Sequence, residues 1–163
     1  MRISKNSLIQ WIGEDARLER VLHIDFDRNW ASMYPIPVNS KKAIGMPYDT
    51  EAQILKDSIE NGAAQIVPED PYSLSPSNDN IDGNDTGTPV PRLLWKEAEL
   101  SKEHRTKRDE VWEVLGQYVQ GLKILNREKR GKIVDRIIEK HEWTKPVIYK
   151  YLHRWWQTGQ VKN

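Results

Sequence analysis

The residues with the clearest chemistry lie at positions 144–158, where a helix is predicted. Ile148, Leu152 and Trp155 recur at spacings of four and three residues and therefore form a core face. The residues predicted to point outward form a face that has cationic and hydrogen-bonding groups and no carboxylate: Lys145, Val147, Tyr149, Lys150, His153 and Arg154. Lysine and arginine can meet guanine O6 and N7 or phosphate oxygens, and tyrosine can reach a phosphate. We therefore predict that this face enters the major groove of double-stranded DNA.

Residue types mark the boundaries of this predicted recognition helix. Thr144 is the predicted N-cap, because its hydroxyl can accept a hydrogen bond from a free backbone N–H of the first turn. Pro146 suits that turn because its missing N–H has no helical partner there, and Gly159 is the matching stop signal. The free N–H groups of residues 144–147 also favour a phosphate. Thr144 is therefore included among the predicted DNA-binding residues.

Another helix is predicted immediately before, from the N-cap Asn126 to about Lys140. Its apolar face comprises Ile133, Val134, Ile137 and Ile138, and basic residues occupy most other positions: Arg127, Lys129, Arg130, Lys132, Arg136 and Lys140. Residues 141–143 form a short break, and Trp143 can fill the corner between the two helices, as in a helix-turn-helix unit. We expect this first helix to lie across the DNA backbone, with Arg130 and Lys132 among the contacts.

The N-terminal residues 1–67 predict a small β-rich domain with one helix. Apolar stretches separated by turn residues predict strands over 8–12, 20–26 and 30–34, with a further strand over 63–67. Pro35 and Pro37 are expected to end the third strand. A helix is predicted from about residue 49 to Asn61 and Gly62. The interpretation is a barrel-like or sheet-plus-helix domain, so that the chain as a whole belongs to the α+β class.

Composition divides the chain into two functional parts. Residues 68–91 are rich in Pro, Ser, Asn, Asp and Gly, and they predict a flexible acidic linker. Residues 92–163 are predicted to be a helical helix-turn-helix domain, with one long helix or two over 93–119. Positions 1–90 carry 8 Lys and Arg against 14 Asp and Glu, whereas 91–163 carry 17 against 10. The basic C-terminal part attracts a polyanion, and the acidic part is expected to dock protein or to maintain solubility.

Other chemistries have little support in the sequence. Cysteine is absent and the four histidines are scattered, so we expect no metal site and no cofactor. His153 has no Ser, Cys or acid partner at a meaningful spacing, so we expect no catalytic residue and no small-molecule substrate. No apolar run reaches the length of a spanning helix, and the N-terminus lacks the features of a secretory signal. We expect a cytoplasmic protein without a membrane partner.

The segment TKPVIYKYLHRWWQTGQ at 144–160 resembles the pattern T-K-x-x-V-Y-K-x-L-R-R-Y-W-Q-R-G-Q of TnsB-type transposases. These are the DDE-family subunits of heteromeric bacterial cut-and-paste transposons. The similarity extends back through IVDRIIEKH at 133–141 and more loosely into the N-terminal part. His153 and Thr158 stand where the family pattern has arginine, which removes cationic character at those positions.

The resemblance implies the N-terminal fragment of a longer transposase, present in the bacterial cytoplasm at the nucleoid. A later RNase H-like domain would hold the three carboxylates that bind Mg²⁺, and the chain ends at Asn163 before it. The fragment is therefore expected to recognise transposon-end DNA without cutting it, and to meet other transposase subunits.

Two alternatives remain open at this point. The chain could be a helix-turn-helix transcriptional regulator whose acidic N-terminal domain senses or dimerises. It could also be a protein-interaction module of a transposition complex, in which the helices pack on a partner subunit. Steep salt dependence of binding distinguishes DNA recognition from docking through apolar surface.

Overall fold

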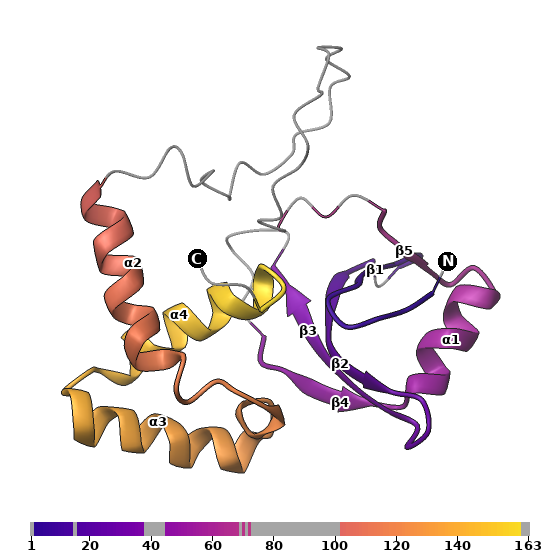
Figure 1. Cartoon of the computed structure of the whole chain (residues 1–163). Helices are drawn as coiled ribbons and strands as arrows, with labels where there is room; N and C mark the ends of the chain where they lie inside the picture. Colours follow the sequence, from indigo (N-terminus) through magenta and orange to yellow (C-terminus); the bar gives the residue numbers. More distant parts are fainter. Residues whose placement is uncertain are drawn as a thin grey trace.

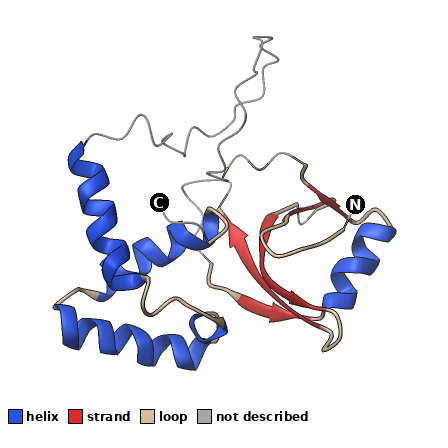
Figure 2. Cartoon of the chain, viewed as in Figure 1, coloured by secondary structure: helices blue, strands red, loops and turns tan. Residues whose placement is uncertain are grey.

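The N-terminal part of the computed structural model is an open antiparallel sheet of five strands with one helix (Figures 1 and 2). The structure describes residues 2–14, 16–37, 45–68, 70, 72 and 102–160. The spatial order is β4-β3-β2-β1-β5. The strands are β1 (Leu8–Trp11), β2 (Leu18–Asp25), β3 (Trp30–Ile36), β4 (Tyr48–Thr50) and β5 (Ala64–Ile66), and the helix is α1 (Ala52–Glu60). The prediction of an α+β fold is confirmed. The barrel-like alternative is wrong, because β4 and β5 remain at separate edges.

The long hairpin of β2 and β3 forms the centre of the sheet. Leu18 pairs with Ile36 at one end and Asp25 with Trp30 at the other, where Asn29 in a left-handed conformation (φ 49°) completes the turn. β3 continues through Pro35, contrary to our expectation. Strand β4 pairs only with residues 31–33 of β3, so Pro35 lies beyond that pairing, where its ring faces Gly45. A proline is tolerated there because its missing N–H costs no ladder hydrogen bond.

The C-terminal part is helical over the residues that the structure describes. It comprises α2 (Lys102–Leu115), the 3₁₀ turn η2 (Leu122–Ile124), α3 (Arg127–His141) and α4 (Lys145–Gln157). Asn126 caps α3 as predicted, because its side chain accepts a hydrogen bond from the backbone N–H of Lys129. Residues 93–101 of the predicted helix lie outside the described residues, as does most of the predicted linker.

The two faces of the sheet bury different cores. One face packs under α1 around Ile9, Val21, Met33 and Leu55. The other face contributes Leu8, Leu22, Tyr34 and Ile36 to a cluster that also contains the buried residues of α2, α3 and α4. Figure 1 shows α4, in yellow, lying beside β2 and β3, with which it is in contact. This shared core between sheet and helices was not predicted from the sequence.

No helix among the described residues is both long and apolar enough to cross a membrane.

Candidate nucleic-acid interface

Helices α3 and α4 meet at a corner of three residues, 142–144. Glu142 ends α3 in a left-handed conformation (φ 56°), and its N–H donates to the carbonyl of Ile138 (3.0 Å). Trp143 is half-buried at the corner, with its ring 6.5 Å from that of His141 and 6.2 Å from that of Tyr151. The chain then turns back along α4 (Figure 1). Trp143 therefore occupies the corner, as predicted.

Thr144 is the N-cap of α4 by position, but its side chain makes no capping hydrogen bond. The prediction of that bond is wrong, and Pro146 supplies a reason. A capping oxygen normally accepts from the second or third N–H of the helix, and the second residue here is a proline without an N–H. Thr144 is exposed, and so is Lys145 beside it.

The core face of α4 agrees with the predicted periodicity. Ile148 and Leu152 are fully buried, and Trp155 is nearly so. They join Val134 and Ile137 of α3 in one cluster. Packing between the two helices therefore fixes which side of α4 can face outward.

The opposite side of α4 carries Val147, Lys150 and Arg154, which we call the exposed face of α4. Their spacings of three and four residues place them along one line of the helix. Lys150 and Arg154 are exposed, and Val147 retains 40% of its surface. Among the described residues, no salt bridge involves either cation. This face can present two unpaired positive charges and an apolar group to a ligand.

Tyr149 and His153, both predicted to face outward, are half-buried on the side of α4 that meets the sheet. The His153 ring lies 6.2 Å from that of Tyr149 and 5.5 Å from that of Trp156. Its Nδ1 is 3.2 Å from the hydroxyl of Tyr34 in β3. The outward assignment of His153 is corrected accordingly, because the sheet occupies the space that the sequence analysis left open to DNA.

Burial governs the protonation of this contact. Desolvation, with a smaller contribution from the charge of Arg130, lowers the pKa of His153 to about 4. Burial also raises the pKa of Tyr34 above its usual value, so its hydroxyl stays protonated. The neutral ring of His153 can therefore accept the hydrogen bond that Tyr34 donates.

We expect the free energy of unfolding to decrease as the pH falls from about 6.5 toward 4. The unfolded chain holds His153 at its ordinary pKa of 6.5 and binds a proton that the folded protein excludes. The contribution of His153 to the free energy of unfolding is complete above pH 6.5 and is lost progressively as the pH falls toward 4. Because the ring is partly exposed, solvent screens its charge, and we expect the free energy of unfolding to fall by only about 1–2 kcal/mol.

Urea unfolding at several pH values measures this effect. His153→Asn, which cannot titrate, should show a shallower decrease than the unmodified chain. Equal slopes for the two proteins would contradict the assignment.

Arg130, predicted to contact DNA, is instead buried, with 3% of its surface exposed. Its Nη1 donates to the carbonyls of Leu125 (2.9 Å) and Ile124 (3.3 Å), at the end of η2. Its guanidinium carbon lies 5.6 Å from the ring centroid of Trp156. Arg130 thus holds the turn that precedes α3, and the expectation that it lies on the outer surface is corrected.

The outer surface of α3 carries a line of cations. The line comprises Lys129, Lys132, Arg136 and Lys140, at spacings of three and four residues, and all four are exposed. Exposed carboxylates follow a neighbouring line and comprise Glu128, Asp135 and Glu139. The predicted residue Lys132 is therefore exposed to a ligand, with Lys129 and Arg136 as cationic neighbours and Glu128 and Asp135 as acidic ones.

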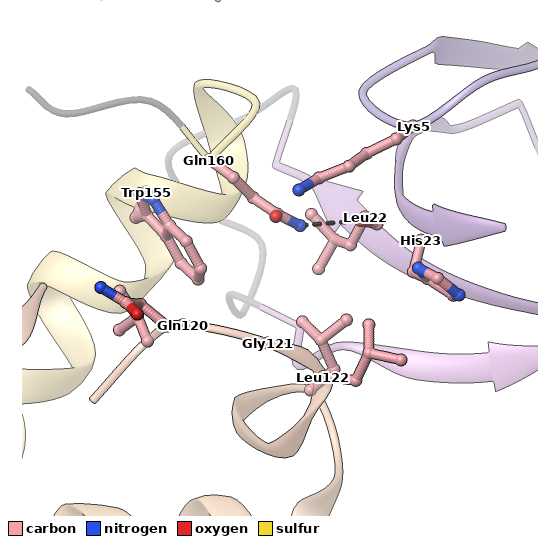
Figure 3. A pocket seen from close by; sticks show the side chains of 10 residues that line it. Lys5, Leu22, His23, Gln120, Gly121, Leu122, Trp155 and Gln160 are labelled. Atoms are coloured by element: carbon pink, nitrogen blue, oxygen red, sulfur yellow. Dashed lines mark hydrogen bonds between the residues drawn. The ribbon is translucent and has the colours of Figure 1, made fainter. Parts of the chain in front are cut away.

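A pocket of about 220 Å³ lies where the sheet meets the helical part (Figure 3). Lys5 and His23 contribute from the N-terminal part, and Gln120, Trp155 and Gln160 from the C-terminal part. None of these was predicted from the sequence as a site residue, because the pocket exists only where two distant segments pack together. Among the residues described, no three His, Cys, Asp or Glu side chains come together as a metal site would require.

A sheet joined to a helical part that exposes an acid-free cationic helix face is an arrangement suited to binding a polyanion. The comparisons with known proteins are more specific. Residues 108–163 match the family model of the TnsB second domain. This range contains α3, α4 and the C-terminal half of α2, and it leaves out the N-terminal sheet.

A stretch of 78 residues is 27% identical to the Transposon Tn7 transposition protein TnsB of Escherichia coli. The stretch covers 48% of this chain and 11% of that protein, so the chain spans a small part of its relative's length. The resemblance to TnsB-type transposases drawn from the sequence is confirmed by these two matches.

Proposed function

We propose that this chain binds double-stranded DNA sequence-specifically, at the ends of a transposon, as the N-terminal region of a TnsB-type transposase. In this proposal α3 and α4 act as a helix-turn-helix unit, and α4 is the recognition helix. The observation that carries the proposal is the exposed face of α4, whose two cations have no carboxylate partner among the described residues. The match of residues 108–163 to the TnsB second domain supports it.

The residues of the proposed interface have distinct roles. Lys150 and Arg154 can donate to guanine O6 and N7 or to phosphates, and Val147 can contact the methyl group of thymine. Thr144 and Lys145 lie at the N-terminus of α4, where the helix dipole favours a phosphate. Lys132 and the other cations of α3 then contact the backbone as α3 crosses it. Tyr149 reaches DNA only from the edge of the interface, because most of its surface is covered.

The remaining parts of the transposition reaction belong to the longer protein in this proposal. Strand cleavage and joining would require a separate Mg²⁺-dependent domain, so the described region serves as a DNA-binding part without catalysis. The acidic N-terminal part is left free to meet other transposase subunits. The linker of residues 68–91 and the division into parts at 67 and 92 remain proposals as well.

A binding titration tests the central proposal. A duplex selected from a randomised pool by the full chain is labelled, and its anisotropy is compared with that of a duplex of the same composition in shuffled order. We expect the selected duplex to bind at least tenfold more tightly, since single base-pair mismatches cost about 1–3 kcal/mol each. Affinity should also fall steeply between roughly 50 mM and 200 mM salt. Equal affinity for both duplexes would sink sequence-specific recognition.

A further inference from the structure

A buried arginine of β2 holds the C-terminal end of α4. Arg20 is fully buried, and its Nε donates to the carbonyl of Gln157, the last residue of α4 (2.8 Å). The carbonyl groups at the end of a helix lack helical partners and carry partial negative charge. A guanidinium at this position satisfies one of them and interacts favourably with the dipole.

Asp70 balances the buried charge. Both terminal nitrogens of Arg20 donate to its carboxylate, with Nη2 lying 2.8 Å from Oδ1, and Nη1 also donates to the carbonyl of Asn6 (2.9 Å). Asp70 follows β5 and falls within the range predicted as a linker. A buried cation needs such a partner, because an unpaired charge in the interior is strongly destabilising. The start of that range is therefore part of the contact between sheet and helix.

Neighbouring contacts hold α4 against the sheet beyond the arginine itself. Gly159 adopts a left-handed conformation (φ 81°) close to Asn6 and Arg20, where a side chain would contact both. The turn allows the Gln160 amide to donate to the carbonyl of Leu22 (2.9 Å), as Figure 3 shows. One turn before the end of α4, His153 meets Tyr34. The helix is thus fixed at several points along one side.

We propose that Arg20 and Asp70 are positioning residues for DNA recognition. By clamping the end of α4 to the sheet, they set the direction in which the exposed face of α4 points. A recognition helix that is held in one orientation binds with a smaller ordering cost than one that moves relative to the rest of the protein. The sheet thereby takes part in recognition without contacting a base. The effect on DNA rests on the proposed function, whereas the clamp itself can be measured without DNA.

Distance measurement between two spin labels tests the clamp in the full chain. The chain contains no cysteine, so Asp27→Cys in the β2–β3 turn and Glu139→Cys on α3 give two unique exposed labelling sites. Asp70→Asn removes the balancing charge with little change of shape, and Arg20→Met removes the guanidinium. Asp49→Asn is the matched control, because Asp49 is an exposed carboxylate on the same sheet. Asp70→Glu tests rescue by the conservative change.

We expect one narrow distance distribution for the unmodified chain and the Asp49→Asn control, and a broader one for Asp70→Asn and Arg20→Met. The measurement is made where circular dichroism shows native helix content for each variant. Asp70→Glu should restore part of the narrow distribution. If Arg20→Met does not fold, Asp70→Asn alone carries the test. A distribution in Asp70→Asn as narrow as in the control would overturn the clamp.

The DNA measurement separates positioning from stability. Asp70→Asn should weaken binding of the selected duplex by about fivefold or more, with an unchanged salt dependence because the cations of α4 remain. Unchanged affinity together with a broadened distribution would overturn the positioning role. Failure of the unmodified chain to prefer the selected duplex would instead overturn the proposed function, and the distance measurement would still report on the clamp.

Discussion

Trp156→Ala is expected to lower the free energy of unfolding by about 3–5 kcal/mol, because it empties a large volume at the centre of the shared core. The side chain is fully buried. Its ring lies 5.6 Å from that of Tyr34 in the sheet and 5.5 Å from that of His153 in α4. The indole therefore supports both parts of the protein at once. Urea unfolding, followed by circular dichroism, measures the change.

The matched control for this prediction is Leu122→Ala. Leu122 keeps 43% of its surface exposed, so its truncation should cost much less. Because Trp156 joins sheet and helices, the variant should also unfold in two steps where the unmodified chain unfolds in one. If Trp156→Ala lowered the free energy of unfolding no more than Leu122→Ala does, the two parts would not share this core.

The double variant Lys150→Ala, Arg154→Ala is expected to weaken binding of the selected duplex by about 30-fold or more, since each contact with a base edge contributes on the order of 1–3 kcal/mol and two such contacts are removed. Both side chains are exposed and outside the core, so the variant should keep the stability of the unmodified chain. The salt dependence should become shallower by about one ion for each phosphate that the variant no longer neutralises. Anisotropy titration at several salt concentrations measures both effects.

Lys56→Ala provides the control for charge alone. Lys56 is an exposed cation of α1, which covers the face of the sheet away from α4. Its removal changes the net charge without touching the exposed face of α4. If the double variant bound as tightly as this control, the assignment of the DNA-binding face would be wrong.

The periodicity of apolar residues predicted the packing of helices that follow one another in the sequence. The spacing of Ile148, Leu152 and Trp155 identified the core face of α4, and Asn126 marked the start of α3. The contact of α4 with the sheet was not predictable in this way. It joins Arg20 to residues more than a hundred positions later, and a single sequence carries no signal of which distant surfaces meet.

Arg130, Tyr149 and His153 were predicted to face outward because their contacts with distant segments could not be foreseen. The spacing of residues along α3 and α4 nevertheless indicates that these side chains are covered. Arg130 shares a helical line with Val134 and Ile137, at spacings of four and three, and this line is the buried side of α3. Tyr149, His153 and Trp156 form a second line on α4, at the same spacings, and this line faces the sheet. Helix α4 therefore buries two faces, and only the third, with Val147, Lys150 and Arg154, stays free.

Nuclear magnetic resonance of the backbone amides, recorded while the selected duplex is added to the full chain, reports directly which residues contact DNA. We expect the largest changes in chemical shift at residues 144–154 and along the cationic line of α3, with little change in α1. Shift changes confined to the sheet would contradict recognition of DNA through the exposed face of α4. Identical shift changes with the selected and the shuffled duplex would contradict sequence-specific recognition.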